Sequence, residues 1–359
     1  MKTLFQRKDD HIRICADEQV GFRTRSTLFQ DVDLIHNALP ELSLDRIDTG
    51  ITLFGKRLAA PLLIASMSGG TPEAARLNEA LARAAQRHRI GLALGSQSAL
   101  LADPPRRDGF MLRKQAPDAL LLGNIGAVRA RGLSAERIEA ELLAPFELDA
   151  LCIHLNPAQE LIQPEGDRDF GGCLDAIERL AASLPHPIIV KETGCGISRN
   201  VGIRLVDAGV RWVDVSGAGG TSWVGVETLR SEGDAASIGE SLWDWGIPTA
   251  ASLVQLSGLE LRTIATGGMS SGLDVAKAIA LGAHAVGVAR PLLKAFVRGG
   301  EAGLDRAIGK LIQGLRMVML LAGASDLDAL RRLPWIPGPN LRAWMEPDTP
   351  AALRARLGI

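Results

Sequence analysis

The sequence predicts an α/β fold: a single (β/α)8 TIM barrel with an N-terminal extension and a long insertion between strands six and seven. Three observations lead to this prediction. Eight short apolar runs recur along the 359 residues, helical patterns lie between them, and no composition break or low-complexity linker divides the chain. An open doubly wound sheet is the alternative, but such a sheet rarely needs eight near-equal units.

The eight runs are rich in Leu, Ile, Val and Ala, and most end in small or polar residues. Continuous apolar runs are typical of strands covered on both faces, as in parallel sheets. The expected strands span residues 61–67, 91–96, 119–124, 150–155, 187–192, 212–216, 262–267 and 285–290. Apolar residues at helical spacing predict helices over residues 72–88, 134–144, 174–184, 198–208 and 272–281.

Two regions exceed a minimal barrel, although residues 1–359 are expected to form one domain. Residues 1–60 precede the first strand and contain charged, helix-like stretches. Residues 219–261 separate strands six and seven and carry Trp223, Trp243 and Trp245. Long insertions in barrels are usually lids or interfaces, so we expect one of these roles here.

Composition narrows the function classes. Lys and Arg number 40 and Asp and Glu number 41, a balance that calls for neither nucleic acid nor an anionic membrane surface. No run of apolar residues is long enough to predict a membrane span, and residues 1–7 lack a signal-peptide core. Four scattered cysteines without a C-x-x-C pair disfavour a disulfide framework or structural zinc, which favours a cytoplasmic location.

Polar residues follow nearly every predicted strand, where a barrel builds its active site. These segments are residues 66–70, 96–98, 124, 154–160, 191–192, 216–221, 266–268 and 289–290. Any single position among them could be an ordinary solvated loop residue. Lys191 and His154 argue for a site, because each lies within or at the end of an otherwise apolar run.

The ends of strands seven and eight suggest a phosphate site. Loops at these two places often hold phosphate through backbone N–H groups and a helix N-terminus, and glycine allows close approach. Gly267 and Gly268 follow strand seven, and Arg290 follows strand eight. A tight turn without any ligand would also use paired glycines. Lys191 could form a Schiff base, hold a phosphate or hold a cofactor ring anion, or else be a surface lysine.

Residues 154–160 form the densest polar cluster, His-Leu-Asn-Pro-Ala-Gln-Glu. Glu160 is its lone carboxylate. Mg²⁺ is commonly bound by one carboxylate, with substrate phosphates and water as its other ligands. A zinc site would need His or Cys ligands beside Glu160, which this segment does not provide.

Together these segments resemble the type 2 isopentenyl diphosphate isomerases, which are FMN-dependent barrel enzymes. The matching segments are residues 7–11, 66–70, 95–97, 154–160, 190–192, 213–221 and 267–283. The first and fourth are specific to that family, and the glycine-rich ones are shared more widely among FMN barrels. Ser68 stands where many relatives carry threonine, which keeps the hydroxyl.

The resemblance implies a role for each matching residue. FMN contacts would be Ala65, Ser66, Met67, Ser96, Asn124, Lys191, Ser216 and Thr221, with Gly267, Gly268, Met269, Ala289 and Arg290 toward its phosphate. Substrate contacts would be Arg7, Lys8, His11, Ser96, Gln97, His154, Asn156 and Gln159. Glu160 would be the Mg²⁺ ligand, and Gln159, His154 and Lys191 would be catalytic.

The implied activity is isomerisation of isopentenyl diphosphate to dimethylallyl diphosphate, in isoprenoid biosynthesis, by proton addition and removal on reduced FMN. NADPH would serve only to reduce the flavin, residues 1–60 would contribute to the substrate site, and the enzyme would be a homo-oligomer, a tetramer or an octamer. Two alternatives remain. An FMN-dependent 2-hydroxy acid oxidase would use a His-Gly-x-Arg segment and tyrosines, which this chain lacks. A non-catalytic phosphate-binding barrel would show no flavin absorbance.

Overall fold

The computed structural model describes residues 4–345 apart from residues 68, 103, 104 and 108. Eight parallel strands form a closed barrel, in which each strand pairs with the next along the chain and the last pairs with the first. They are β4 (Leu62–Ile64), β5 (Gly91–Ala93), β6 (Leu121–Gly126), β7 (Ala150–His154), β8 (Ile188–Lys191), β9 (Trp212–Asp214), β10 (Arg262–Ala265) and β11 (Ala285–Val288). The predicted barrel is therefore confirmed, with every strand where the apolar runs placed it.

The strands are buried on both faces, as their continuous apolar sequences require. One face packs on the surrounding helices, and the other fills the barrel interior with side chains such as Leu63, Leu122 and Ile189. The hairpin of β2 (Ile51–Leu53) and β3 (Lys56–Leu58) adds its own leucines to that interior cluster. It closes the amino end of the barrel, which leaves the carboxyl end for a site.

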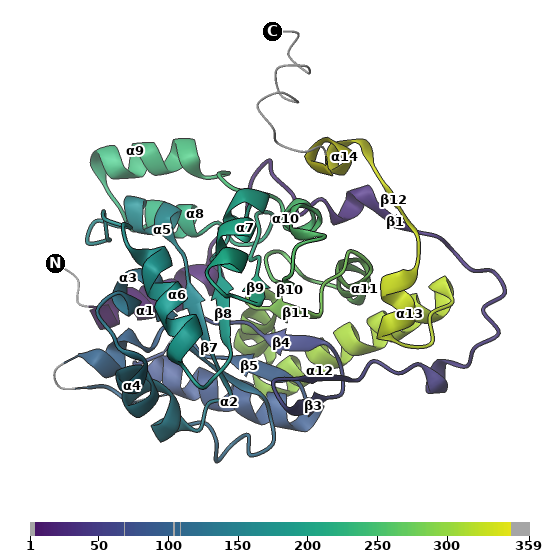
Figure 1. Ribbon diagram of the computed structural model, residues 1–359, viewed down its shortest axis with the longest axis horizontal. Helices are drawn as coiled ribbons and strands as arrows, with labels where there is room; N and C mark the ends of the chain where they lie inside the picture. Colours follow the sequence, from purple (N-terminus) through teal and green to yellow (C-terminus); the bar gives the residue numbers. More distant parts are fainter. Residues whose placement is uncertain (1–3, 68, 103–104, 108, 346–359) are drawn as a thin grey trace, which may run out of the picture.

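Helices surround the barrel (Figure 1). The main ones are α2 (Pro72–His88), α6 (Cys173–Ser183), α7 (Arg199–Asp207), α10 (Thr249–Leu256), α11 (Gly272–Ala280) and α12 (Arg290–Ala322). Four of the five predicted helices match within a residue or two at each end. The fifth, 134–144, is broken into α4 (Ala135–Ile138), a π-helical turn (Glu139–Leu143) and a 3-10 turn (Ala144–Phe146), and Pro145 in the last of these has no N–H to continue an α-helix.

The second barrel unit departs from the strand–helix repeat. Between β5 and β6 the described residues form a 3-10 turn, η3 (Gln97–Leu101), followed by bends and turns, and no α-helix. The segment contains Pro105 and Pro117, which lack the N–H that continues a helix, and the like-charged neighbours Arg106 and Arg107.

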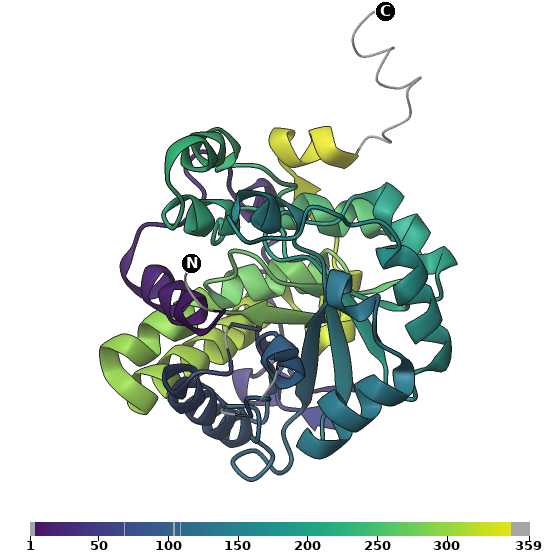
Figure 2. The ribbon, with the colours of Figure 1, turned by 90° about the vertical axis from the view of Figure 1, so that its left-hand side faces the viewer.

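The N-terminal extension begins with α1 (Leu4–Asp17), which packs against α2, α8 (Trp223–Thr228) and α12. Figure 2 shows this helix, in purple, beside the mouth of the barrel. Farther along, β1 (Val32–Leu34) pairs antiparallel with β12 (Trp335–Pro337), so a later part of the extension lies beside a segment close to the carboxyl end of the chain. That side also carries α13 (Leu327–Arg332) and α14 (Pro339–Met345).

The insertion between β9 and β10 is shorter than predicted. It contains α8 (Trp223–Thr228) and α9 (Gly233–Leu242), which pack together and against α5 (Pro157–Ile162) (Figure 1). The remaining helix, α10, packs against α7 and β10 and is the ordinary crossover helix of this barrel unit. Among the described residues, no helix is both long and apolar enough to cross a membrane.

Candidate active site

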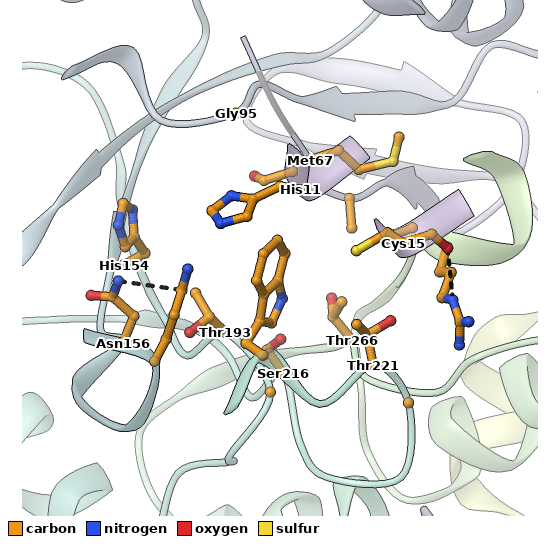
Figure 3. A pocket seen from close by; sticks show the side chains of 18 of the residues that line it. His11, Cys15, Met67, Gly95, His154, Asn156, Thr193, Ser216, Thr221 and Thr266 are labelled. Atoms are coloured by element: carbon orange, nitrogen blue, oxygen red, sulfur yellow. Dashed lines mark hydrogen bonds between the residues drawn. The ribbon is translucent and has the colours of Figure 1, made fainter. Parts of the chain in front are cut away.

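A cavity of about 730 Å³ opens at the carboxyl end of the barrel, a size typical of ligand sites. Residues that follow all eight strands line it, and α1 and Trp223 add to its wall. In Figure 3, His154 and Asn156 lie on one side, Thr221 and Thr266 lie on the other, and His11 reaches in from α1. Of the predicted site residues, all except Gln97 line this cavity.

Gln97 lies behind the cavity wall rather than in it. Its side chain is fully buried, with Nε2 donating to the Leu142 carbonyl at 2.7 Å and Oε1 accepting from the Asn124 N–H at 2.8 Å. Both amide atoms of Gln97 are thus engaged within the protein, and the proposed substrate contact of Gln97 stays a prediction. The Gln97 side chain fixes the backbone of Asn124, which does line the cavity. Ser68 lies outside the described residues.

His154, at the end of β7, is held as a neutral acceptor. Asn124 donates through Nδ2 to Ser66 Oγ and to the Leu94 carbonyl, so its Oδ1 is an acceptor, 2.7 Å from His154 Nδ1. His154 Nδ1 must therefore carry the proton, which leaves Nε2 with a free lone pair. Burial, with the charges of Lys191 and Lys8, lowers the pKa of His154 to about 3.

Lys191 ends β8 beside two other chemically important positions. In the barrel register it pairs with His154 of β7 on one side and with Asp214 of β9 on the other. Its Nζ donates to the Glu192 carbonyl at 2.6 Å. Burial raises the pKa of Asp214, and the nearby Lys191 charge opposes that rise. The register thus places a cationic side chain with a buried carboxylate neighbour at the cavity floor.

Glu192 organises the loop that follows β8. Its Oε2 accepts from the N–H groups of Thr193, Gly194 and Cys195, at 2.6, 2.7 and 2.5 Å. Burial nevertheless raises its pKa to about 7. The three bonds shape the turn that brings Thr193 and Gly194 to the cavity wall.

Two glycine-rich loops meet backbone to backbone on the far wall. A Cβ on Gly220 would lie 2.3 Å from the Gly268 nitrogen, and one on Gly267 would lie 2.2 Å from the Gly217 oxygen. Gly267 and Gly268 also have φ values of +102° and +77°, in the region that favours glycine. Only glycine permits this approach, which leaves a cradle of backbone groups at the cavity. Such a cradle fits a phosphate group.

Arg290 begins α12 beside that cradle. Its Nε donates to the Cys15 carbonyl at 2.9 Å and its second terminal nitrogen to the Glu18 carbonyl at 2.5 Å. The first of these bonds is the dashed line beside Cys15 in Figure 3. These carbonyls belong to the end of α1 and the residue after it. Arg290 therefore lines the cavity beside the glycine cradle and also ties α1 to the barrel.

Glu160 stands alone as a candidate metal ligand. Its Oε1 accepts from Asn156 Nδ2 at 2.7 Å and its Oε2 from the Asp167 N–H at 2.9 Å. Within the described ranges, no group of three or more His, Cys, Asp or Glu residues could hold a metal ion. A single oriented carboxylate at the cavity wall fits Mg²⁺ completed by phosphate oxygens and water.

Lys8 of α1 is buried, and its hydrogen bonds within the described part of the chain go to carbonyl groups, those of Gly69 at 2.6 Å and Ser96 at 3.2 Å. Burial, with the neighbouring Arg7 charge, lowers the pKa of Lys8 to about 8. An ammonium group without a carboxylate partner at a cavity wall suits an anionic ligand.

Glu227 of α8 is the main residue that sequence reasoning missed. Its side chain is fully buried, and Oε1 accepts from His11 Nε2 at 2.7 Å and from Gln159 Nε2 at 3.2 Å. Burial alone would raise the pKa of Glu227, but the bonds and charges of His11 and Arg230 hold it below its ordinary value. A carboxylate within the apolar run Trp-Val-Gly-Val-Glu-Thr was the available signal.

Comparison with known proteins identifies the family. A family model described as FMN-dependent dehydrogenase matches residues 2–103 and 154–335. An isopentenyl-diphosphate delta-isomerase of Methanosarcina barkeri is 46% identical over 93% of this chain and 92% of its own length. One of Thermococcus kodakarensis is 41% identical over 98% of this chain and 96% of its own.

The chain belongs to the type 2 isopentenyl-diphosphate delta-isomerases.

Solved structures with lower sequence identity to this isomerase have the same fold. A mandelate oxidase mutant with an FMN adduct superposes with a TM-score of 0.61 at 23% identity, covering 90% of this chain and 95% of the oxidase. This likeness concerns the fold alone. The oxidase alternative is disfavoured because the isomerase relatives are about twice as similar in sequence, and because the chain has no tyrosine.

Proposed function

We propose that the chain interconverts isopentenyl diphosphate and dimethylallyl diphosphate, using reduced FMN and Mg²⁺, with NADPH needed only to reduce the flavin. One observation carries the proposal. A single cavity joins the glycine cradle after β9 and β10, which suits a flavin phosphate, to a cationic and metal-ligating wall, which suits a diphosphate. A small C5 group attached to that diphosphate would then lie between the two.

The chain's own groups fit the flavin. The N–H groups of Gly267 and Gly268, with Ala289 and Arg290, would hold its phosphate, and Ser66, Met67, Asn124, Ser216 and Thr221 would contact the remainder. Lys191 offers a positive charge for the ring. When bound, reduced FMN supplies a proton at N5 and an electron-rich face that stabilises the positive charge developing on a protonated alkene.

The diphosphate would bind at the opposite wall. Arg7 and Lys8 supply two cations, Asn156 an amide donor, and Glu160 the protein ligand of Mg²⁺. The C5 group offers few contacts of its own. Binding energy from the remote diphosphate would therefore orient the reacting carbons.

His154 and Gln159 would act as orienting groups at the reacting end. With its pKa near 3, His154 stays neutral at physiological pH and accepts hydrogen bonds through Nε2. Gln159 is fixed by its bond to the ionised Glu227, which also fixes His11. The helix α1 and Trp223, whose ring meets that of His11 edge-on at 5.1 Å, would exclude water from the cavity.

The proposal includes the setting of the enzyme. We expect a cytoplasmic homo-oligomer, a tetramer or an octamer, that takes a small isoprenoid diphosphate and neither nucleic acid nor membrane. The four cysteines, all free, support a reducing compartment.

Anaerobic incubation of the FMN-loaded protein with NADPH, Mg²⁺ and isopentenyl diphosphate tests the function. We expect dimethylallyl diphosphate by proton NMR, and none when FMN or Mg²⁺ is left out. A yellow, folded protein that yields no product under these conditions would refute the proposal.

A further inference from the structure

The N-terminal helix lies against the cavity through one face. Arg7, Asp10 and His11 are spaced i, i+3 and i+4, so their side chains leave α1 on the same side. Arg7 and His11 line the cavity. Each of the three forms an ion pair with a residue outside α1.

Those ion pairs converge on Arg230, which follows α8. Its side chain is only 4% exposed, and one terminal nitrogen bonds Glu227 Oε2. Its Nε lies 3.8 Å from Asp10 Oδ2, and its other terminal nitrogen lies 3.6 Å from Glu165 Oε1. One buried guanidinium thus faces three carboxylates, from α8, from α1 and from the loop after α5.

The same carboxylates reach back to α1. Glu227 accepts from His11 at 2.7 Å, and Glu165 lies 3.5 Å from the Arg7 guanidinium. His11 and Arg7 of α1 therefore contact Glu227 and Glu165, the same two carboxylates that pair with Arg230. Without the Arg230 charge, Asp10 would approach Glu227 and Glu165 as like charges, which repel.

We infer that Arg230 is a positioning residue that docks α1 over the cavity, so that Arg7, Lys8 and His11 present fixed side chains to the substrate. Arg230 itself is not among the cavity-lining residues, so it acts through others. An arginine suits this role because its planar fork can serve several carboxylates at once, which a lysine ammonium does less well. The statement about substrate rests on the proposed function, whereas the docking of α1 does not.

Hydrogen exchange of the α1 amides, followed by mass spectrometry on the FMN-loaded protein without substrate, tests the docking. In Arg230→Gln we expect exchange within Leu4–Asp17 to accelerate by about tenfold or more, since a buried charge partner is lost. Arg230→Lys should recover part of the protection. Arg137→Gln is the control, because it removes a cation paired with Glu141 four residues along the same helical segment, outside α1 and the helices that α1 packs against. Equal exchange in folded Arg230→Gln and wild type would overturn the inference.

Asp10→Asn gives a second, milder test that leaves the Arg230–Glu227 pair intact. We expect about fivefold faster exchange in α1, and a rise in KM for isopentenyl diphosphate of similar size with kcat and NADPH-driven flavin reduction nearly unchanged. A purely structural role would not split KM from kcat in this way. If Arg230→Gln fails to fold, Asp10→Asn alone tests the docking of α1. Unchanged exchange of the α1 amides in Asp10→Asn then overturns the inference. An inactive wild-type protein would instead refute the proposed function and leave the exchange result standing.

Discussion

The substitution Gly220→Ala tests the glycine cradle. The new Cβ would lie 2.3 Å from the Gly268 nitrogen and 2.8 Å from its Cα, both backbone atoms that no rotamer change can move. Ordinary contact is about 3.5 Å, so one loop must shift by about 1 Å. The unloaded protein can relax in this way, but bound FMN would need the loops in place, and overpacking of this kind costs about 1–3 kcal/mol.

At about 1.4 kcal/mol for each tenfold change, that strain weakens FMN binding by about 5-fold to 150-fold. Titration of the unloaded protein with FMN, followed by quenching of flavin fluorescence, measures the change. Gly132→Ala is the control, since a Cβ there meets nothing within 4 Å. A Gly220→Ala protein that binds FMN as tightly as wild type would refute the assignment of this wall to the flavin phosphate.

Four further predictions concern the other groups. Glu160→Gln should raise the Mg²⁺ concentration needed for half-maximal activity by about tenfold or more, because the charged ligand is lost, and an unchanged Mg²⁺ dependence would remove Glu160 from the site. Lys191→Ala should weaken FMN binding or slow flavin reduction by NADPH, and a wild-type flavin spectrum with wild-type turnover would contradict it. Deletion of residues 1–11 should abolish turnover while FMN stays bound, because Arg7, Lys8 and His11 are removed but the strand ends are not, and full activity after truncation is the contrary result. KM for the diphosphate should rise above pH 8, because burial lowers the pKa of Lys8 to about 8 and the neutral amine no longer attracts an anion; Lys8→Arg should remove that rise, and an identical pH profile in the variant would show that another group titrates.

The barrel could be predicted because its strands are buried on both faces and so read as apolar runs with polar ends. The strand positions also predicted which polar residues lie together in the cavity, because the carboxyl ends of parallel strands meet at one end of the barrel. Gln97 does not line that cavity, since the chain turns into η3 there and points the side chain back toward Leu142. Alternation along a strand does not reveal such a turn.

In the insertion between β9 and β10, the important contacts could not be predicted from the sequence. Glu227 and Arg230 lie in a segment without strand register, so nothing local indicates that they meet α1, which is more than 200 residues away in sequence. Their importance comes from tertiary contacts between α1, α5 and α8. The regular helix α10 was likewise absorbed into the predicted insertion, because its apolar sequence follows a long irregular stretch without a break.

The central claim is that this cavity moves a proton and consumes no electrons. The most direct measurement is the reaction in D₂O under anaerobic conditions, in which NMR counts deuterium in the product and absorbance follows NADPH. We expect many turnovers to deuterium-labelled dimethylallyl diphosphate after NADPH has reduced the bound flavin once. Consumption of one NADPH for each product molecule would contradict it.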